Sequence, residues 1–331
     1  MSPPAAARAI EPSVEPSAET APACAAGLPS LVVPAAGSRE PARDRAQLVA
    51  WLAYATCAVV WGSTYLAIAV ALDSFTPYGM VAVRFGIAAV LTFGLGRLLG
   101  EPLPSARELP HLLWVGTLLL GICNTLVVWS ETHVSSGVAA VLCALVPAWF
   151  AVLTMKSEPL GARGWAGTAL GLAGVAVLVA PSGGHAIDLA GVGALLVSTV
   201  LWAVGTLHHR NHVRGGGVLT NAGIEMVAAA VIGNVAAPFF GGFVTRPPTP
   251  RALVAVGYLA IFGSCLAYTA HSYLAKAWNP VRSGTYAYLN PVIAVVLGAA
   301  LLGERFTPRM GLGMAVILAG VALVQYRGRG R

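Results

Sequence analysis

The chain has 331 residues, of which 57% are hydrophobic and only 10% are charged, against roughly 25% charged residues in soluble domains. Its mean hydropathy is +0.75, so a soluble enzyme or binding module is excluded because no soluble fold could cover this apolar surface. The formal net charge is +7, but the Lys and Arg residues are scattered over predicted loops and ends, where they orient membrane helices. This distribution argues against a nucleic-acid partner.

Residues 1–47 differ in composition from the rest of the chain. They are rich in Pro, Ala, Ser and Glu and have no amphipathic period. This composition predicts a disordered cytoplasmic tail. A cleaved signal peptide is not expected, because no basic start leads into a long apolar run.

Ten apolar stretches follow one another from about Leu48 to Tyr326, with short loops between them. A helix of roughly 17–25 apolar residues crosses a bilayer core of about 30 Å, and it satisfies its own backbone hydrogen bonds there. The sequence therefore predicts an all-α integral membrane protein with ten transmembrane helices and no extramembrane domain. The predicted spans are 48–72, 78–99, 111–131, 134–155, 163–180, 188–208, 220–241, 251–272, 281–302 and 309–326.

Basic residues are distributed unequally between the two sides of the predicted membrane domain. An even number of spans places both termini on one side, and, with Arg8 far out in the tail left aside, that side holds 14 Lys and Arg against 4 on the other. The excess predicts that both termini are cytoplasmic. Eighteen of the 20 basic residues are Arg, which together with the abundant Ala and Gly indicates a bacterial source and hence the bacterial inner membrane. The 14 are Arg39, Arg43, Arg45, Arg97, Arg107, Lys156, Arg163, Arg210, Arg214, Lys276, Arg282, Arg327, Arg329 and Arg331, and the 4 are Arg246, Arg251, Arg305 and Arg309.

The two halves of the chain resemble each other at a constant offset of 146 residues. Glu158 and Arg163 in the first half correspond to Glu304 and Arg309 in the second, and each pair precedes a run that ends in Ala-Gly-Val-Ala. Each half has five predicted spans, an odd number, so the second copy must enter the membrane from the opposite side. Inverted repeats are typical of transporters whose substrate site lies between the repeats, near the membrane midplane.

These motifs also resemble a known family. Trp61-Gly-Ser-Thr-Tyr, with Arg84-Phe85 in the next span, is similar to the start of an EamA-type unit of the drug/metabolite transporter superfamily. The series Pro147, Glu158, Gly167 and Gly174, with its repeat in the second half, resembles the rest of the unit. Met155-Lys-Ser-Glu-Pro departs from the apolar-Gly-Glu-Arg sequence that is commoner in the family.

The resemblance implies an organisation for most of the chain. It covers about 48–326 and implies two EamA-like repeats, residues 48–181 and 182–326, followed by a basic cytoplasmic tail at 327–331. It also implies a ten-helix bundle whose central cavity is lined by helices 1, 3, 4, 6, 8 and 9. The string from Trp129 to Gly137 resembles a bacterial subgroup described as exporters.

Arg84, Glu131 and Glu225 are ionisable residues some way inside predicted spans, where an uncompensated charge is costly. Arg84 and Glu131 lie at similar depth in the outer half of the second and third spans, so we expect them to pair. The alternative is that Arg84 contacts an anionic group of the substrate. Glu225, near the cytoplasmic end of the seventh span, is expected either to carry a coupling proton or to be an interfacial charge near Arg210 and Arg214.

Polar and aromatic side chains predict where the substrate cavity lies. Aromatic residues near span ends often form interfacial belts, but Trp61, Trp202 and Tyr288 are too central for that role. Pro291 removes a backbone donor from the ninth span, and such breaks are tolerated where they line a cavity. The expected cavity-lining residues are Trp61, Ser63, Thr64, Asn124, Trp129, Trp202, Tyr268, His271, Tyr286, Tyr288 and Asn290.

Other chemistries find little support in the sequence. The cluster of His208, His209 and His212 at the end of the sixth span could hold a metal, but no carboxylate or Cys accompanies it, so lipid headgroup contact is preferred. The five cysteines show no pairing or metal spacing. No nucleotide-binding loop, His-Glu-x-x-His or Gly-x-Ser-x-Gly motif occurs, so we predict neither catalytic residues nor a cofactor.

The sequence and the resemblance together predict a secondary active transporter working by alternating access. Efflux of a small metabolite, such as an amino acid or related solute, or of a drug is preferred. The alternatives are a proton-coupled importer of a similar solute and, less favoured, an intramembrane enzyme. The expected partners are the small-molecule substrate, membrane lipid and, in the coupled alternative, protons, and the chain is expected to be a monomer or homodimer.

The asymmetry of Lys and Arg generates a first prediction, on topology. A reporter fused after Arg331 should be cytoplasmic, and one inserted near Gly184 should be periplasmic, because the side with more Lys and Arg stays in the cytoplasm. Fusions to alkaline phosphatase and to a fluorescent protein measure the two locations. Finding both reporters on one face of the membrane would contradict the inverted-repeat organisation.

Overall fold

The computed structural model describes residues 40–134, 136–179, 188–302 and 307–326. The described residues from 44 onward belong to one compact unit. Glu304 and Arg305 of the predicted second repeat, and the reporter position Gly184, lie outside the described residues.

The described residues are helical, and no β-strand occurs among them beyond one isolated bridge between Phe75 and Val244. The first half comprises α1 (Glu40–Leu72), α2 (Pro77–Leu98), α3 (Leu109–Val115), the π-helical η2 (Gly116–Cys123), α4 (Asn124–Ser130), α5 (Ser136–Cys143), α6 (Val146–Leu153) and α7 (Ala162–Val179). The second half comprises α8 (Leu189–His212), α9 (Val218–Ala236), the 3₁₀ turn η3 (Ala237–Phe239), α10 (Pro250–Tyr258), the π-helical η4 (Leu259–Leu266), α11 (Ala267–Ala277), α12 (Pro280–Gly284), α13 (Tyr286–Leu302) and α14 (Pro308–Gln325).

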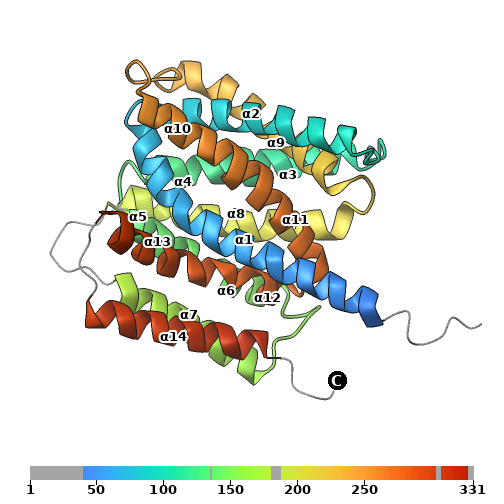
Figure 1. Cartoon of the computed structure of the whole chain (residues 1–331), viewed down its shortest axis with the longest axis vertical. Coiled ribbons are helices and arrows are strands. Elements are labelled where there is room, and N and C mark those ends of the chain that lie inside the picture. The colour runs from blue at the N-terminus through green and yellow to red at the C-terminus, as the bar shows by residue number, and fades with distance from the viewer. Residues whose placement is uncertain (1–39, 135, 180–187, 303–306, 327–331) are drawn as a thin grey trace, which may run out of the picture. The chain divides into compact units, whose positions relative to one another are not determined.

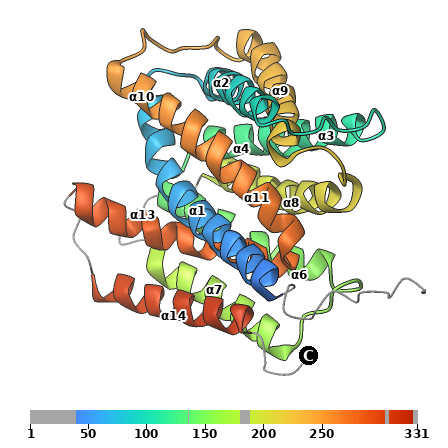
Figure 2. The same cartoon turned by 45° about the vertical axis from the view of Figure 1, so that its right-hand side comes forward.

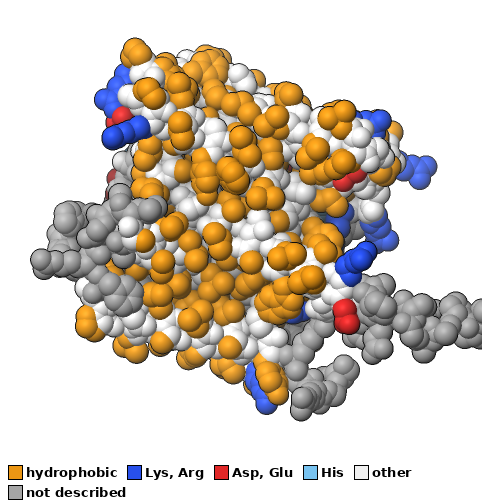
Figure 3. Space-filling model, in the orientation of Figure 1, with side chains coloured by type: hydrophobic (Ala, Val, Ile, Leu, Met, Phe, Trp, Pro, Cys, Tyr) orange, Lys and Arg blue, Asp and Glu red, His pale blue; other side chains and the backbone are white. Residues whose placement is uncertain are grey.

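Seven helices in the described part are long and apolar enough to cross a membrane, judged by length and composition. The prediction of an all-α membrane protein is confirmed. Figure 3 shows hydrophobic side chains spread over the middle of one face, with Lys and Arg side chains gathered towards its margins. The seven helices are Asp44–Leu72, Pro77–Leu98, Leu109–Ser130, Leu189–His212, Val218–Phe239, Pro250–Ala277 and Pro308–Gln325, and a shorter apolar helix covers Val138–Leu153.

Some predicted boundaries were wrong. α1 begins at Glu40, so the helix includes the last eight residues of the segment that was predicted to be disordered. The predicted span 134–155 is two helices, because Pro147 near the start of α6 has no N–H to donate to the carbonyl of Cys143, where α5 ends. The predicted span 281–302 is also divided, at Thr285, whose hydroxyl donates to the carbonyl of Arg282 and competes with the helical bond.

The third and eighth predicted spans each contain a π-helical segment that sequence periodicity did not predict. η2 joins α3 to α4, and η4 joins α10 to α11, so both helices continue through a wider turn. A π-helical turn rotates the residues that come after it relative to an ideal α-helix, and such turns are frequent at functional sites. Cys123 at the end of η2 and Asn124 directly after it line a pocket between the two halves of the chain, and η4 bonds two of the lining side chains through Gly263 and Ser264.

Two helix pairs, α2 with α9 and α7 with α14, run side by side in both Figure 1 and Figure 2. Glycines allow their backbones to approach closely. A Cβ atom on Gly320 of α14 would lie 2.6 Å from the backbone nitrogen of Gly171 and 2.8 Å from the carbonyl oxygen of Gly167, both on α7. On α9, a Cβ atom on Gly233 would lie 2.5 Å from the backbone nitrogen of Ala82. Small residues drive helix association in lipid through this kind of close packing.

The connection that follows α2 is held to the connection between α8 and α9 by Glu108. Its Oε1 accepts hydrogen bonds from the backbone nitrogens of Gly215 (2.5 Å) and Arg214 (2.9 Å), and its Oε2 accepts one from the Ser105 hydroxyl (2.8 Å). These donors, with Gly215 first, lower the pKa of Glu108 to about 2. Because the pKa in the folded chain is below its usual value of about 4.3, this stabilisation is present above that value and is lost only as the pH falls towards 2.

The other end of α2 is fastened to the segment that follows α9. The hydroxyl of Thr76 donates to the carbonyl of Gly242 at 2.6 Å, and the backbone nitrogen of Thr76 donates to the carbonyl of Phe243 at 3.2 Å. Asp73 and Arg246 form an ion pair beside them. Both ends of α2 are therefore connected to the segments that flank α9, which fixes these two helices relative to each other.

The close contact of α7 and α14 generates a second prediction. Gly320→Ala should destabilise the protein by about 1–3 kcal/mol, because the new methyl group forces two backbones apart. Gly94→Ala in α2 is the matched control, since a Cβ atom there meets nothing within 4 Å and Ala is the better helix former. Thermal unfolding of the purified protein in detergent measures both. Equal melting temperatures for the two variants would contradict the described packing.

Candidate functional site

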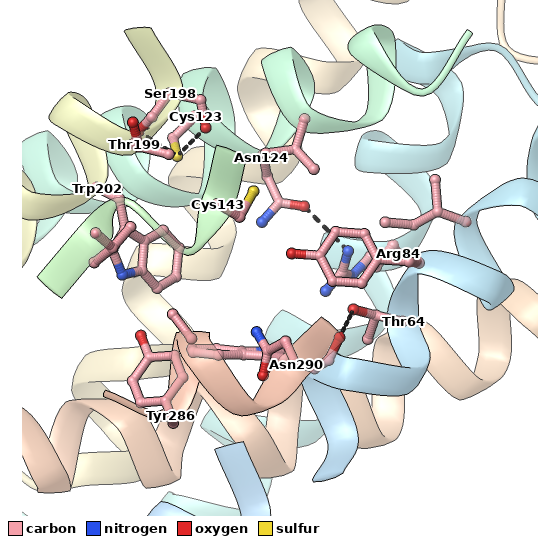
Figure 4. Close-up of a pocket in the computed structure, with 16 residues that line it drawn as sticks. Thr64, Arg84, Cys123, Asn124, Cys143, Ser198, Thr199, Trp202, Tyr286 and Asn290 are labelled. Carbon is pink, nitrogen blue, oxygen red and sulfur yellow. Dashed lines mark hydrogen bonds between the residues drawn. The ribbon is translucent and has the colours of Figure 1, made fainter. Parts of the chain in front are cut away.

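A pocket of about 660 Å³, including open solvent, lies between the two halves of the chain (Figure 4). Helices α1, α2, α4, α5, α6, α8 and α13 and the end of η2 contribute to its walls. The lining residues are Trp61, Thr64, Tyr65, Ile68, Arg84, Cys123, Asn124, Val127, Cys143, Val146, Ser198, Thr199, Trp202, Tyr286, Ala287 and Asn290.

Arg84 of α2 places a cation in the wall of this pocket. Its side chain is buried, its Nε donates to the Ser264 hydroxyl at 2.8 Å and its Nη1 donates to the Asn124 side-chain oxygen at 3.1 Å (Figure 4 shows the second bond). Ser264 belongs to η4 and Asn124 follows η2 directly, so the two π-helical segments position both partners. No carboxylate is among the sixteen lining residues. Among the described residues, the hydrogen-bond partners of the Arg84 side chain are thus neutral groups.

The predicted ion pair between Arg84 and Glu131 was wrong. Both carboxylate oxygens of Glu131 are buried, and within the described part of the chain neither has a hydrogen-bond partner. Glu131 lies seven residues after Asn124, so at 1.5 Å per residue the two are about 10 Å apart along the helix axis. Arg84 bonds Asn124, so the guanidinium group lies at the level of Asn124 along this helix rather than at the level of Glu131. A similar depth estimated from sequence was therefore too coarse to predict the partner.

Three aromatic side chains from different helices form one side of the pocket. The Trp61 ring lies 5.3 Å from the Trp202 ring and 5.2 Å from the Tyr286 ring, both in edge-on contact. The indole nitrogen of Trp61 donates to the carbonyl of Gly263 in η4 at 3.0 Å, which satisfies its polar atom. These bonded rings give the pocket an apolar wall that is fixed in place.

Asn290 adds an amide next to this wall and lies one residue before Pro291. In the orientation that satisfies its neighbours, its amide nitrogen donates to the carbonyls of Tyr286 (3.1 Å) and Ala58 (3.2 Å). α13 lies close to α1 here, since a Cβ atom on Gly62 would be 2.6 Å from Cβ of Ile293. Asn290 therefore connects the helix interrupted by proline to α1 at the pocket.

Six of the eleven residues expected to line the substrate cavity line this pocket: Trp61, Thr64, Asn124, Trp202, Tyr286 and Asn290. The other five lie elsewhere. The Ser63 hydroxyl bonds the Tyr258 hydroxyl at 2.6 Å, and the Trp129 ring lies 4.0 Å from the ring of His133. The Tyr288 hydroxyl donates to the carbonyl of Thr168 in α7, so Tyr288 faces away from the pocket.

Tyr268 and His271, the remaining two, lie behind the aromatic wall. His271 is 3% exposed, its Nδ1 lies 3.2 Å from the Tyr286 hydroxyl and its Nε2 lies 3.2 Å from the Thr206 hydroxyl. Tyr268 donates to the Glu225 carboxylate at 2.8 Å. Both side chains support the wall from outside the pocket.

Glu225 is fully buried, so the alternative of an interfacial charge near Arg210 and Arg214 was wrong. Its Oε1 lies 2.7 Å from Nδ1 of His209, in addition to the bond from Tyr268. Arg210 pairs with Glu158 instead. The role of Glu225 as a proton carrier stays a prediction.

Several lining residues were not predicted, including Tyr65, Cys123, Cys143, Ser198 and Thr199. The helical period contains a signal for two of them, because Ser198 and Thr199 lie four and three residues before Trp202 and so share its face. Cys123 has its Sγ 3.1 Å from the Ser198 hydroxyl. Small polar residues at these spacings were the signal that sequence reasoning passed over.

The histidine cluster at the end of α8 has a partner from α3. Nδ1 of His111 lies 3.0 Å from Nε2 of His208, and the His208 and His212 rings stack at 4.1 Å. Among the described residues, no group of three or more His, Cys, Asp or Glu side chains has an arrangement that could hold a metal ion. His209 faces inward to Glu225 rather than joining this cluster.

Comparisons with known proteins agree with this architecture. A model of the EamA-like transporter family matches residues 48–180 and 189–326. The chain is 37% identical over 275 residues to the "Uncharacterized inner membrane transporter YedA" of Escherichia coli, which covers 80% of this chain and 87% of that protein. It is 31% identical over 278 residues to the "Probable terminal-alkyne amino-acid exporter" of Streptantibioticus cattleyicolor, covering 82% of this chain and 92% of that protein.

One solved crystal structure has a similar fold. It superimposes with a TM-score of 0.70 and covers 85% of this chain and 96% of its own, at 20% sequence identity. At this identity the likeness shows the fold alone. It indicates that this arrangement of helices occurs in another protein.

The separation of Arg84 from Glu131 generates a third prediction. Glu131→Gln should leave the melting temperature in detergent unchanged or raised, because it replaces a buried carboxylate without a hydrogen-bond partner, a defect that costs roughly 1–3 kcal/mol. Arg84→Met should lower the melting temperature, because Ser264 and Asn124 lose their donor. Losses of similar size in the two variants, with partial recovery in the double variant, would instead show that the two residues pair.

Proposed function

We propose that this chain, which belongs to the EamA-like transporter family of the drug/metabolite transporter superfamily, is a secondary active transporter for a small solute bearing a carboxylate, such as an amino acid. The observation that carries the proposal is Arg84, a buried cation that lines the pocket and whose hydrogen-bond partners among the described residues are neutral. The names of the two relatives, an inner membrane transporter and an amino-acid exporter, support it. The family and these relatives indicate a transporter rather than an enzyme.

The geometry of Arg84 suits a carboxylate. A guanidinium group has five N–H donors in a planar fork that matches a carboxylate with two parallel bonds. Two of these donors are used by Ser264 and Asn124, so others are available to a ligand. Hydrogen bonds to charged groups contribute about 1.5–3 kcal/mol, and the rings of Trp61 and Trp202 offer apolar contact to the rest of the solute.

The proposal includes ten transmembrane helices in two inverted repeats, residues 48–181 and 182–326. Support comes from the two matches of the family model and from the paired irregularities, namely a π-helical segment in the third and eighth predicted spans and a division of the fourth and ninth. Both halves contribute to the pocket. Alternating access would then arise from rocking of the two repeats about a central site.

The proposed location is the bacterial inner membrane, with both termini cytoplasmic, and the preferred direction is efflux. The relatives' names support the membrane and the export of an amino acid. Proton-coupled uptake of a similar solute is the alternative direction. Direction is set by coupling and gradients rather than by the pocket, so both alternatives use the same binding residues.

A flux assay with the purified full chain in liposomes tests the function and gives the fourth prediction. Liposomes loaded with an unlabelled amino acid should take up the same labelled amino acid by exchange, for at least one of the proteinogenic set. The matched amines that lack the carboxylate should neither exchange nor compete. Exchange of amines as fast as amino acids, or no exchange by any amino acid, would contradict the proposal.

Two pocket variants sharpen this prediction. Trp202→Ala and Asn290→Ala should reduce exchange at least tenfold, which corresponds to about 1.4 kcal/mol, while expression and membrane insertion stay close to wild type. Trp129→Ala and Asn234→Ala are the matched controls, since neither side chain lines the pocket. Normal flux in both pocket variants would show that the solute binds elsewhere.

A further inference from the structure

A second polar site lies inside the helix bundle, away from the solute pocket. It joins Glu225 of α9, His209 of α8 and Tyr268 of α11, whose exposed fractions are 0%, 4% and 1%. The Glu225 carboxylate lies 2.7 Å from Nδ1 of His209 through one oxygen and accepts the Tyr268 hydroxyl at 2.8 Å through the other. None of the three lines the pocket.

Among the described residues, His209 is the basic side chain that contacts the Glu225 carboxylate directly. Arg84 of α2 bonds Ser264 and Asn124, and Arg97 of α2 donates to the Glu101 carbonyl. Lys276, near the end of α11, lies within electrostatic range of Glu225, and no hydrogen bond between them is among those of the described residues. The titratable and charged groups on the elements packed here are Tyr78, Arg84 and Arg97 (α2), His111 (α3), Cys123 (η2), His208, His209, Arg210 and His212 (α8), and Tyr268, His271, Tyr273 and Lys276 (α11).

A carboxylate and an imidazole in contact can hold either one or two protons between them. With one proton the pair is neutral overall, and with two it carries one positive charge. A net charge enclosed in a low-dielectric interior is costly, so each change in proton number favours a different exposure of the site to water. Protonation therefore changes the free-energy difference between a conformation that encloses the site and one that exposes it to water. A ligand must bind two conformations unequally in this way to shift the equilibrium between them.

The site is linked to the solute pocket through side chains in contact. The Tyr268 ring centroid lies 6.4 Å from that of Trp202 and 6.0 Å from that of His271. His271 in turn lies 3.2 Å from the Tyr286 hydroxyl, and both Trp202 and Tyr286 line the pocket. A movement of Tyr268 caused by protonation of Glu225 would reach the aromatic wall directly.

We propose that Glu225 and His209 form a proton-binding site separate from the solute pocket, and that its occupancy is coupled to solute movement. Binding adds one proton to the carboxylate–imidazole pair, and release returns that proton to water. The coupling rests on the proposed transport function, whereas proton binding does not. The two claims are tested by separate measurements.

Infrared difference spectra of the purified full chain, recorded as the pH is lowered, test proton binding without any solute. Protonation of a buried carboxylate produces a carbonyl band that should be lost in Glu225→Gln and kept in Glu131→Gln, the matched variant of the other buried carboxylate. Tyr268→Phe should move this band to higher frequency, because the carbonyl loses a hydrogen bond. A carbonyl band that survives in Glu225→Gln, or that disappears in Glu131→Gln, would overturn the proposal. If Glu225→Gln does not fold, the Tyr268→Phe variant decides instead, and an unshifted band in that variant would overturn the proposal.

Proteoliposomes with and without an imposed pH gradient test the coupling. In wild type the gradient should increase accumulation of the exchanged amino acid, and in Glu225→Gln accumulation should fall to the value measured without a gradient. Wild-type accumulation that ignores the gradient would overturn the coupling. A band dependent on Glu225 in a chain that moves no amino acid would overturn the proposed function and still support the proton site.

Discussion

The hydrogen bonds that hold Arg84 inside the bundle are the interaction on which the site depends. A cation at this depth is costly unless its donors are satisfied, and the bilayer offers no water to satisfy them. Ser264 comes from the second half of the chain and Asn124 from the first, and both are placed by π-helical segments. The same bonds therefore stabilise the buried charge, join the two halves and present the guanidinium group to the pocket.

A second constraint is that α2 and α9 carry opposite charges that do not neutralise each other. Arg84 faces the pocket with neutral partners, while Glu225 bonds His209 and Tyr268. α2 and α9 nevertheless pack with backbone contact at Gly233. Two buried ionisable groups on adjacent helices that do not pair with each other are expensive for stability, a cost that the proposed ligand and proton binding would account for.

The sequence predicts the class, the approximate spans and about half of the expected pocket residues, because apolar length and central depth are readable from composition. It does not predict which way a side chain faces. Tyr286 and Tyr288 have similar depth, yet at 100° per residue they lie about 200° apart on α13, so one lines the pocket and the other contacts Thr168. Depth alone also mispaired Arg84 with Glu131. Each π-helical turn rotates the rest of its helix, and no periodicity in the sequence indicates where such a turn lies.

The room left at Arg84 depends on a missing side chain as much as on the bonds it makes. A Cβ atom on Gly263 would lie 3.1 Å from Nη2 of Arg84 and 3.2 Å from a methyl carbon of Thr64. The carbonyl of Gly263 also accepts the indole N–H of Trp61. One glycine in η4 thus keeps the outer end of the guanidinium group uncovered and fixes the aromatic ring beside it. A carboxylate entering the pocket would meet both features together, so the wider π-helical turn serves the polar and the apolar part of the proposed site at once.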